Sequence, residues 1–167
     1  MKFMLQKLKK KLKDQRGLTL IELLAVIVIL GIIAAIAVPS ILGLIDNSKK
    51  DAHVANAQQM VNSAKMAITS DANLQKSGTT IYLTLQDLID GQYIDEIESP
   101  DSEAYIPKKP DSIKVTADAE NVSYVKIVSG KVESVKLVTS KRGVLKESNK
   151  PVTPKELVRG SVNDQPK

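Results

Sequence analysis

The stretch Gly17-Leu18-Thr19-Leu20-Ile21-Glu22 opens the segment that decides the fold of this chain. From Leu23 to Ile45 no residue is charged over 23 positions. As an α-helix rising ~1.5 Å per residue, this run is roughly 35 Å long, enough to cross the hydrocarbon core of a bilayer. Glu22 places one carboxylate at the edge of the run. The sequence therefore predicts a membrane-spanning helix with a single acid near its start.

Basic charge is concentrated before that helix. The 167-residue chain has a formal charge of +5, but residues 1–17 hold seven Lys and Arg against Asp14 alone. The rest of the chain holds 17 basic and 18 acidic residues. A Lys/Arg cluster beside an apolar span marks the cytoplasmic side of a membrane. Residues 1–13 also have helical apolar spacing, which leaves open a membrane-surface helix or a simply solvated leader.

The order of the leader differs from that of a secretory signal peptide. In a signal peptide the apolar core comes first and the small residues of the cleavage site follow it. Here the small residue, Gly17, precedes the apolar core. Cleavage at Gly17 would therefore leave the apolar helix on the mature protein.

The predicted helix extends beyond the apolar run, from about Leu18 to about Ala72. Its second half is amphipathic, with a stripe that must pack against the rest of the chain. Pro39 predicts a kink or local loosening, and Gly31 forms a small-residue patch that another helix can approach closely. The stripe comprises Val54, Ala57, Val61, Ala64 and Ile68.

Shorter elements follow the long helix. Thr84 to Gly91 predicts a short capped helix, and residues 95–112 an exposed, Pro-containing loop. Val122–Val128 and Val132–Val138 form a hairpin around Ser129-Gly130, in a register that pairs Lys126 with Glu133 and Tyr124 with Val135. Ile113–Ala117 is a third β-rich run. We expect four parts: a leader (1–17), an apolar helix (18–45), a globular domain (46–142) and a flexible tail (143–167).

Composition argues against catalysis. The chain has no Cys, and His53 is its only histidine, which we expect to be structural. Residues 46–167 contain no catalytic triad, metal cluster or phosphate loop, so the sequence predicts neither an enzyme nor a cofactor. The acidic segment Asp95–Glu103 is an alternative calcium loop, but it lacks EF-hand spacing and a solvated loop is favoured.

The leader, Gly17–Glu22 and the long helix with Gly31 and Pro39 together resemble the N-terminus of type IV prepilins. The resemblance is close over residues 1–70. Beyond them the helix–loop–sheet order is similar in architecture, and Thr84–Tyr93 resembles the corresponding part of Gram-positive competence and pilus pilins. The resemblance to type IV prepilins implies an α+β fold, with the long N-terminal helix packed on a small antiparallel sheet. Leu18 departs conservatively from the Phe that usually begins the mature family members.

The resemblance implies a series of processing and assembly steps for the protein. A prepilin peptidase would cut between Gly17 and Leu18 on the cytoplasmic side and N-methylate Leu18. The chain would be a single-pass membrane protein first. A pilus assembly platform would then add the chain to a surface filament. This filament would be a homopolymer whose subunits contact one another through their N-terminal helices. Glu22 would pair with the Leu18 amine of a neighbouring subunit, while Gly31 and Pro39 belong to the same assembly helix.

Physical chemistry gives Glu22 a role independently of the family. A carboxylate in an apolar helix bundle is costly unless it is paired. Cleavage after Gly17 creates an ammonium group four residues away. A single charge pair in an apolar interface can specify register. The competing interpretation is a carboxylate that reaches water at the membrane edge and has no role.

Charge in the rest of the chain is divided. Residues 46–106 carry four basic and ten acidic groups, whereas residues 107–150 carry ten basic and five acidic groups. This division suits contacts between subunits, or an anionic partner such as extracellular DNA on residues 107–150. A solvated surface is favoured because only Tyr124 offers a stacking ring on the sheet.

The sequence thus predicts a filament subunit serving adhesion, motility or DNA uptake. The alternatives are a pseudopilin of a type II secretion-like or competence apparatus, or a minor DNA-binding pilin. A membrane-tethered enzyme is disfavoured by the absence of catalytic motifs.

Overall fold

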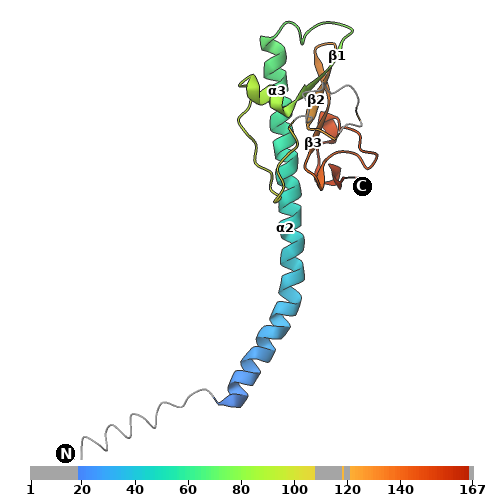
Figure 1. The fold of residues 1–167 in the computed structure, drawn as a ribbon. Coiled ribbons are helices and arrows are strands. Elements are labelled where there is room, and N and C mark those ends of the chain that lie inside the picture. Colours follow the sequence, from blue (N-terminus) through green and yellow to red (C-terminus); the bar gives the residue numbers. More distant parts are fainter. Residues whose placement is uncertain (1–18, 108–117, 119–120, 166–167) are drawn as a thin grey trace, which may run out of the picture. The chain divides into compact units, whose positions relative to one another are not determined.

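The computed structural model describes residues 19–107, 118 and 121–165. The chain divides into two compact units, Met1–Leu44 and Ile45–Lys167. In chain order the elements are α2 (Leu20–Ser70), β1 (Thr80–Thr84), α3 (Leu85–Asp90), β2 (Tyr124–Val128), β3 (Lys131–Val138), β4 (Arg142–Val144), the 3-10 turns η1 (Pro154–Glu156) and η2 (Arg159–Ser161), and β5 (Val162–Asp164) (Figure 1).

The long helix is confirmed. α2 runs for 51 residues without interruption, Pro39 included. Its second half has the predicted stripe: Ala57, Val61, Ala64 and Ile68 are buried, and Val54 is partly buried against the same core. A one-sided apolar face excludes water only by packing on another element, and here the sheet is that element.

The sheet has five antiparallel strands in the order β1-β2-β3-β4-β5. β2 and β3 are the predicted hairpin, and Ser129 and Gly130 both have positive φ (51° and 74°), as a two-residue turn with the strand twist requires. β1 was not predicted, because Ile81-Tyr82-Leu83 is a very short apolar run beside a helix cap. Ile113–Ala117 lies outside the described residues.

The predicted hairpin register is wrong beyond the turn. An irregularity between Lys126 and Ile127 shifts the pairing by one residue, so Tyr124 pairs with Lys136 and Lys126 with Ser134. A bulge of this kind inserts one extra residue into one strand. Lys126 still reaches Glu133, with Nζ and Oε2 3.0 Å apart.

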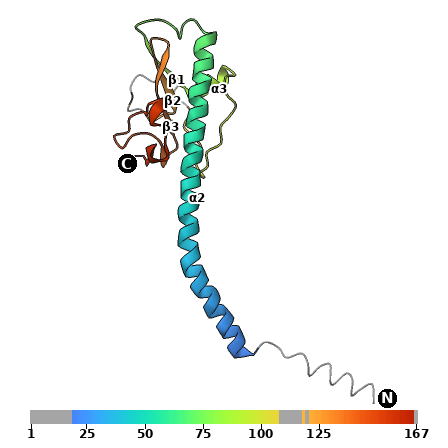
Figure 2. The same cartoon turned by 180° about the vertical axis from the view of Figure 1, so that it is seen from behind.

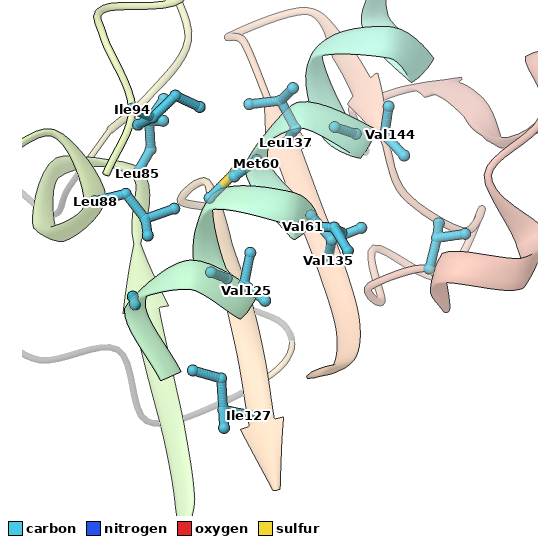
Figure 3. Close-up of a cluster of buried hydrophobic side chains, with 14 of the residues drawn as sticks. Met60, Val61, Leu85, Leu88, Ile94, Val125, Ile127, Val135, Leu137 and Val144 are labelled. Carbon is cyan, nitrogen blue, oxygen red and sulfur yellow. The ribbon is translucent and has the colours of Figure 1, made fainter. Parts of the chain in front are cut away.

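The core lies between α2 and the sheet, with α3 closing one side. Figure 3 shows Met60 and Val61 of α2 beside Val125, Ile127, Val135 and Leu137 of the strands, with Leu85 and Leu88 of α3 adjoining them. The Thr84 hydroxyl caps α3 by accepting from the Asp87 backbone N–H, and Gly91 follows the last helical residue, as predicted.

The C-terminal segment differs from the flexible tail expected for residues 143–167. β4 and β5 extend the sheet, and Leu145, Val152 and Val162 are at most 6% exposed. These isolated apolar residues lie in a polar sequence, so no periodicity predicts that they fill the edge of the core. Burial of single side chains contacted from several elements holds the segment in place.

The segment after α3 also differs from a merely exposed loop. Ile94 and Tyr105 are 7% and 6% exposed, and Ile97 packs on the core. These three apolar residues therefore anchor an otherwise acidic segment to the domain.

Candidate functional site

The start of α2 places Glu22 next to Thr19. Glu22 Oε2 accepts hydrogen bonds from the Thr19 backbone N–H (2.7 Å) and from Thr19 Oγ1 (2.9 Å). In return the Glu22 N–H donates to Thr19 Oγ1 at 3.3 Å. This reciprocal arrangement is a capping box, which satisfies N–H groups left without partners at a helix start. The Thr-x-x-Glu spacing from Thr19 to Glu22 is the local sequence signal of this box, and it was not among the predicted features.

After Glu22, the first part of α2 presents an apolar surface as far as Ile45. Its large hydrophobic side chains from Leu20 to Ile45 are 47–85% exposed. This stretch is long and apolar enough to cross a membrane, and none of its most apolar window is buried inside the protein. Exposed apolar area of this extent requires a lipid or protein environment.

Gly31 and Pro39 lie within that surface. A Cβ built at Gly31 meets no atom within 4 Å. The small-residue patch is therefore open on the chain itself. Gly17 and Leu18, the predicted cleavage residues, lie outside the described residues.

A second group of polar side chains surrounds His53 in the globular unit. His53 is fully buried, and its Nε2 lies 2.8 Å from Asp101 Oδ2 while its Nδ1 lies 2.8 Å from the Tyr105 hydroxyl. Arg142 binds the same carboxylate through Nε and Nη2, both at 2.7 Å. Its Nη1 reaches Asp46 Oδ1 at 2.6 Å. The group thus joins α2, the acidic segment and β4.

The electrostatics of this group favour one set of charges. Hydrogen bonds from Arg142 hold the pKa of Asp101 well below its usual range. Burial lowers the pKa of His53, although Asp101 opposes the shift, and burial raises the pKa of Tyr105 to about 12. Neutral histidine, ionised Asp101 and neutral tyrosine are therefore the stable combination at neutral pH.

His53 is thus a packed structural histidine, as expected. The described residues contain no group of three or more His, Asp or Glu side chains placed to hold a metal ion. The acidic segment, considered above as a calcium loop, directs Asp101 toward Arg142 and His53 instead. These contacts hold α2, the acidic segment and β4 in place relative to one another, so the group has a structural role.

The contacts of the basic side chains on the sheet are relevant to the alternative that residues 107–150 bind DNA. Several basic side chains described between 121 and 150 contact partners within the chain. Lys126 pairs with Asp118 and Glu133, Lys141 with Glu103, and Lys146 with Glu156. Charges neutralised by their own chain contribute less to phosphate binding.

Comparison with known families identifies the N-terminal segment. Residues 12–38 match the model described as the prokaryotic N-terminal methylation motif. No curated protein and no solved structure matched the chain. The motif is typical of type IV prepilins, and its presence implies processing by a prepilin peptidase and pilus-like assembly. The long N-terminal helix packed on an antiparallel sheet is a pilin-like α+β fold, and together with the motif it makes the chain similar to type IV pilin-like proteins.

Proposed function

We propose that this chain is a structural subunit of a type IV pilus or a pilus-like filament, assembled through the first part of α2. The observation that carries the proposal is the charge-free apolar surface of α2 from Leu23 to Ile45, whose large hydrophobic side chains are all exposed. A membrane accounts for such a surface before assembly, and neighbouring helices account for it afterwards.

Processing would act on the segment just before that surface. We propose that cleavage between Gly17 and Leu18 removes a leader with seven basic residues against one acid. N-methylation would then modify the amine of Leu18. Loss of the leader removes the charge that favours a cytoplasmic N-terminus and permits the helix to leave the membrane.

Glu22 has two candidate roles that predict different mutant behaviour. The capping box with Thr19 needs a hydrogen-bonding side chain, and Gln supplies it as well as Glu does. Pairing with the Leu18 amine of a neighbouring subunit needs the negative charge. We propose that the intersubunit pair is the functional role, and that capping positions the carboxylate before assembly.

The Glu22 variants separate these roles. We expect Glu22→Ala and Glu22→Gln to be processed like wild type yet to form no filaments, because both remove the charge. Cell-surface filaments are counted by electron microscopy, with processing followed by the mass of the N-terminal peptide. Wild-type filament numbers from Glu22→Gln would show that the cap alone suffices.

Mass spectrometry of the N-terminus of the surface protein tests the processing proposal directly. The expected peptide begins at Leu18 and carries one added methyl group. A surface protein that retains residues 1–17 would refute the assignment. The same preparation bears on the pseudopilin and minor-pilin alternatives, because a major subunit is the most abundant protein of the filament.

Adhesion, motility and DNA uptake are the proposed uses of the filament. The pairing of Lys126, Lys141 and Lys146 within the chain argues against these three side chains as the main contact with DNA.

A further inference from the structure

His53 is a buried titratable group that the proposed filament function does not use. Its side chain is 0% exposed and lies on α2 within the unit Ile45–Lys167. Both ring nitrogens have partners: Nε2 is 2.8 Å from Asp101 Oδ2, and Nδ1 is 2.8 Å from the Tyr105 hydroxyl oxygen. One partner accepts a proton and the other donates one, so the surroundings match a neutral ring.

Both partners of the ring come from one loop. Residues 91–107 contain no helix or strand, and Figures 1 and 2 show this loop running alongside α2. A second side chain of α2 also holds the loop. Asn56 Nδ2 donates to the Glu98 carbonyl and to the Tyr105 hydroxyl oxygen, both at 3.0 Å. His53 and Asn56 together therefore attach the middle of the loop to α2.

The Tyr105 hydroxyl cannot serve a charged ring as it serves a neutral one. A doubly protonated imidazole donates from both nitrogens. The hydroxyl oxygen would then accept from His53 Nδ1 and from Asn56, and its own proton would lose the ring as its acceptor. Tyr105 is 6% exposed, so the loss of this acceptor destabilises the closed arrangement.

The charged groups that face the ring add to this cost. Asp101 attracts a charged ring, but Arg142 of β4 already binds that carboxylate through Nε and Nη2, each at 2.7 Å. Lys49, one turn before His53 on α2, lies 3.6 Å from the same carboxylate. Three cations would then share one carboxylate. Burial lowers the pKa of His53, Arg142 and Lys49 lower it further, and Asp101 opposes the shift.

The loop is the element at this site that is free to move. α2 is continuous, and β4 is paired with a strand on each side. The backbone N–H groups of Tyr93 and Ile106 fix the two ends of the loop by donating to the carbonyls of Leu88 and Val138. Between these ends the loop is attached by side-chain contacts, and His53 makes two of them.

We propose that His53 is a pH-sensitive switch for this loop: the neutral ring holds residues 94–105 against α2, and the charged ring releases them while the sheet stays folded. Because an unperturbed histidine titrates near pH 6.5, release begins as the pH falls below about 6.5. Every contact involved lies within the unit Ile45–Lys167. The inference therefore does not depend on the filament function.

Thiol accessibility tests the switch, because the chain has no cysteine. Three single variants of the full chain in detergent are labelled with a methanethiosulfonate reagent at about pH 7.5 and about pH 5. Ile97→Cys reports on the loop, where this side chain packs on the core, and Val135→Cys reports on the sheet. Ser102→Cys is already exposed and gives the thiol reactivity at each pH. We expect the Ile97→Cys rate, divided by the Ser102→Cys rate, to rise about fivefold or more at the lower pH, with Val135→Cys still protected.

The same reporters in a His53→Gln background are the control, because an amide does not titrate in this range. A rise at Ile97→Cys that is absent from this background supports the switch. No rise, or a rise that persists with Gln at position 53, overturns it. Equal rises at Ile97→Cys and Val135→Cys would show unfolding of the whole domain and would also overturn local release.

A second measurement needs no change at position 53. The chain has a single histidine, so the ring-proton NMR signals of His53 report its titration without ambiguity. The labelling rate of Ile97→Cys should follow that titration as the pH is lowered. Release at a pH where the ring does not titrate would overturn the switch.

Discussion

At the residue scale, the tautomer of His53 follows from its partners. The Asn56 amide donates to the Tyr105 hydroxyl oxygen at 3.0 Å, so the one hydroxyl proton is available for His53 Nδ1. Nδ1 therefore accepts, and Nε2–H donates to ionised Asp101. A proton on Nδ1 would oppose the Tyr105 proton, which adds to the cost of charging a buried ring.

This geometry predicts a pH dependence of stability. The pKa of His53 is lower in the folded than in the unfolded chain, so the unfolded chain binds the proton first as pH falls below about 6.5. The groups that face the ring are Asp101, Tyr105, Arg142 and Lys49. We expect the contribution of neutral His53 to the free energy of unfolding, measured with urea in detergent, to be fully present above this pH and to be lost progressively as the pH falls below it.

His53→Gln is the control for this pH dependence. It should be less stable at pH 7 because an amide replaces the ring and its paired contacts, but its stability should change less between pH 6.5 and 5. An unchanged slope in this variant would assign the effect to another group. Asp101, whose pKa is lowered, loses its contribution only at lower pH, below its unfolded value of about 3.9.

Arg142 is predicted to be a charged residue on which the stability of the domain depends. Its guanidinium makes a two-bond contact with Asp101 and a third bond to Asp46, and its side chain is 14% exposed. Arg142→Ala should lower the free energy of unfolding by about 3 kcal/mol, because it leaves the Asp101 carboxylate without its main partner. Arg142→Lys should recover only part of this loss, since Lys lacks the planar fork.

The neighbouring Lys141 is the matched control for Arg142. It pairs with Glu103 but is 72% exposed. Lys141→Ala should therefore leave the free energy of unfolding close to that of the wild type in the same measurement. Equal losses from the two variants would contradict a structural role for the buried group.

At the scale of elements, the C-terminal strands close the sheet through a tight approach. Gly143 of β4 pairs with Val138 of β3, and a Cβ there would lie 2.7 Å from Val138 Cα and too close to the Leu137 carbonyl. Backbone atoms cannot move aside as a flexible side chain can. Glycine is therefore required at this position.

Gly143→Ala should destabilise the domain by about 2–4 kcal/mol because it separates β3 from β4. Gly160→Ala is the control: a Cβ there meets nothing within 4 Å, and its stability should change by less than about 0.5 kcal/mol. Urea unfolding followed by circular dichroism measures both. Wild-type stability of Gly143→Ala would favour a loosely attached C-terminal segment, as a flexible tail would be.

At the scale of the whole molecule, substitutions of Gly17 and of Gly31 should stop filament formation at different stages. Gly17→Leu should block cleavage, because a bulky side chain replaces the small residue before the cut, and the chain should keep its basic leader and remain in the membrane. Gly31→Leu should be cleaved normally but should lower filament yield, because helices can no longer approach closely at that patch. N-terminal mass spectrometry and filament counts distinguish the two, and mature protein from Gly17→Leu would refute the cleavage assignment.

Sequence patterns predicted the features that depend on neighbours along the chain. The apolar run, the stripe at Ala57, Val61 and Ala64, and the cap at Thr84 all follow local periodicity or spacing, and all are confirmed. The turn at Ser129-Gly130 was predicted, but the register beyond it was not, because a bulge depends on how both strands pack. The short strands β1 and β5 lack enough residues to show a period.

The sequence by itself determined that a basic N-terminal segment precedes an apolar run with Glu22 at its edge and a polar remainder, because charge and periodicity depend on neighbouring residues. Only the tertiary structure decided that the C-terminal segment completes the sheet, and that His53, Asp101 and Arg142 meet. These residues are 41 to 89 positions apart, and their proximity depends on how α2 and the strands pack. The capping box at Glu22 depends on sequence and on structure. Its spacing is a local property of the sequence, whereas its consequence for assembly depends on what covers the apolar helix.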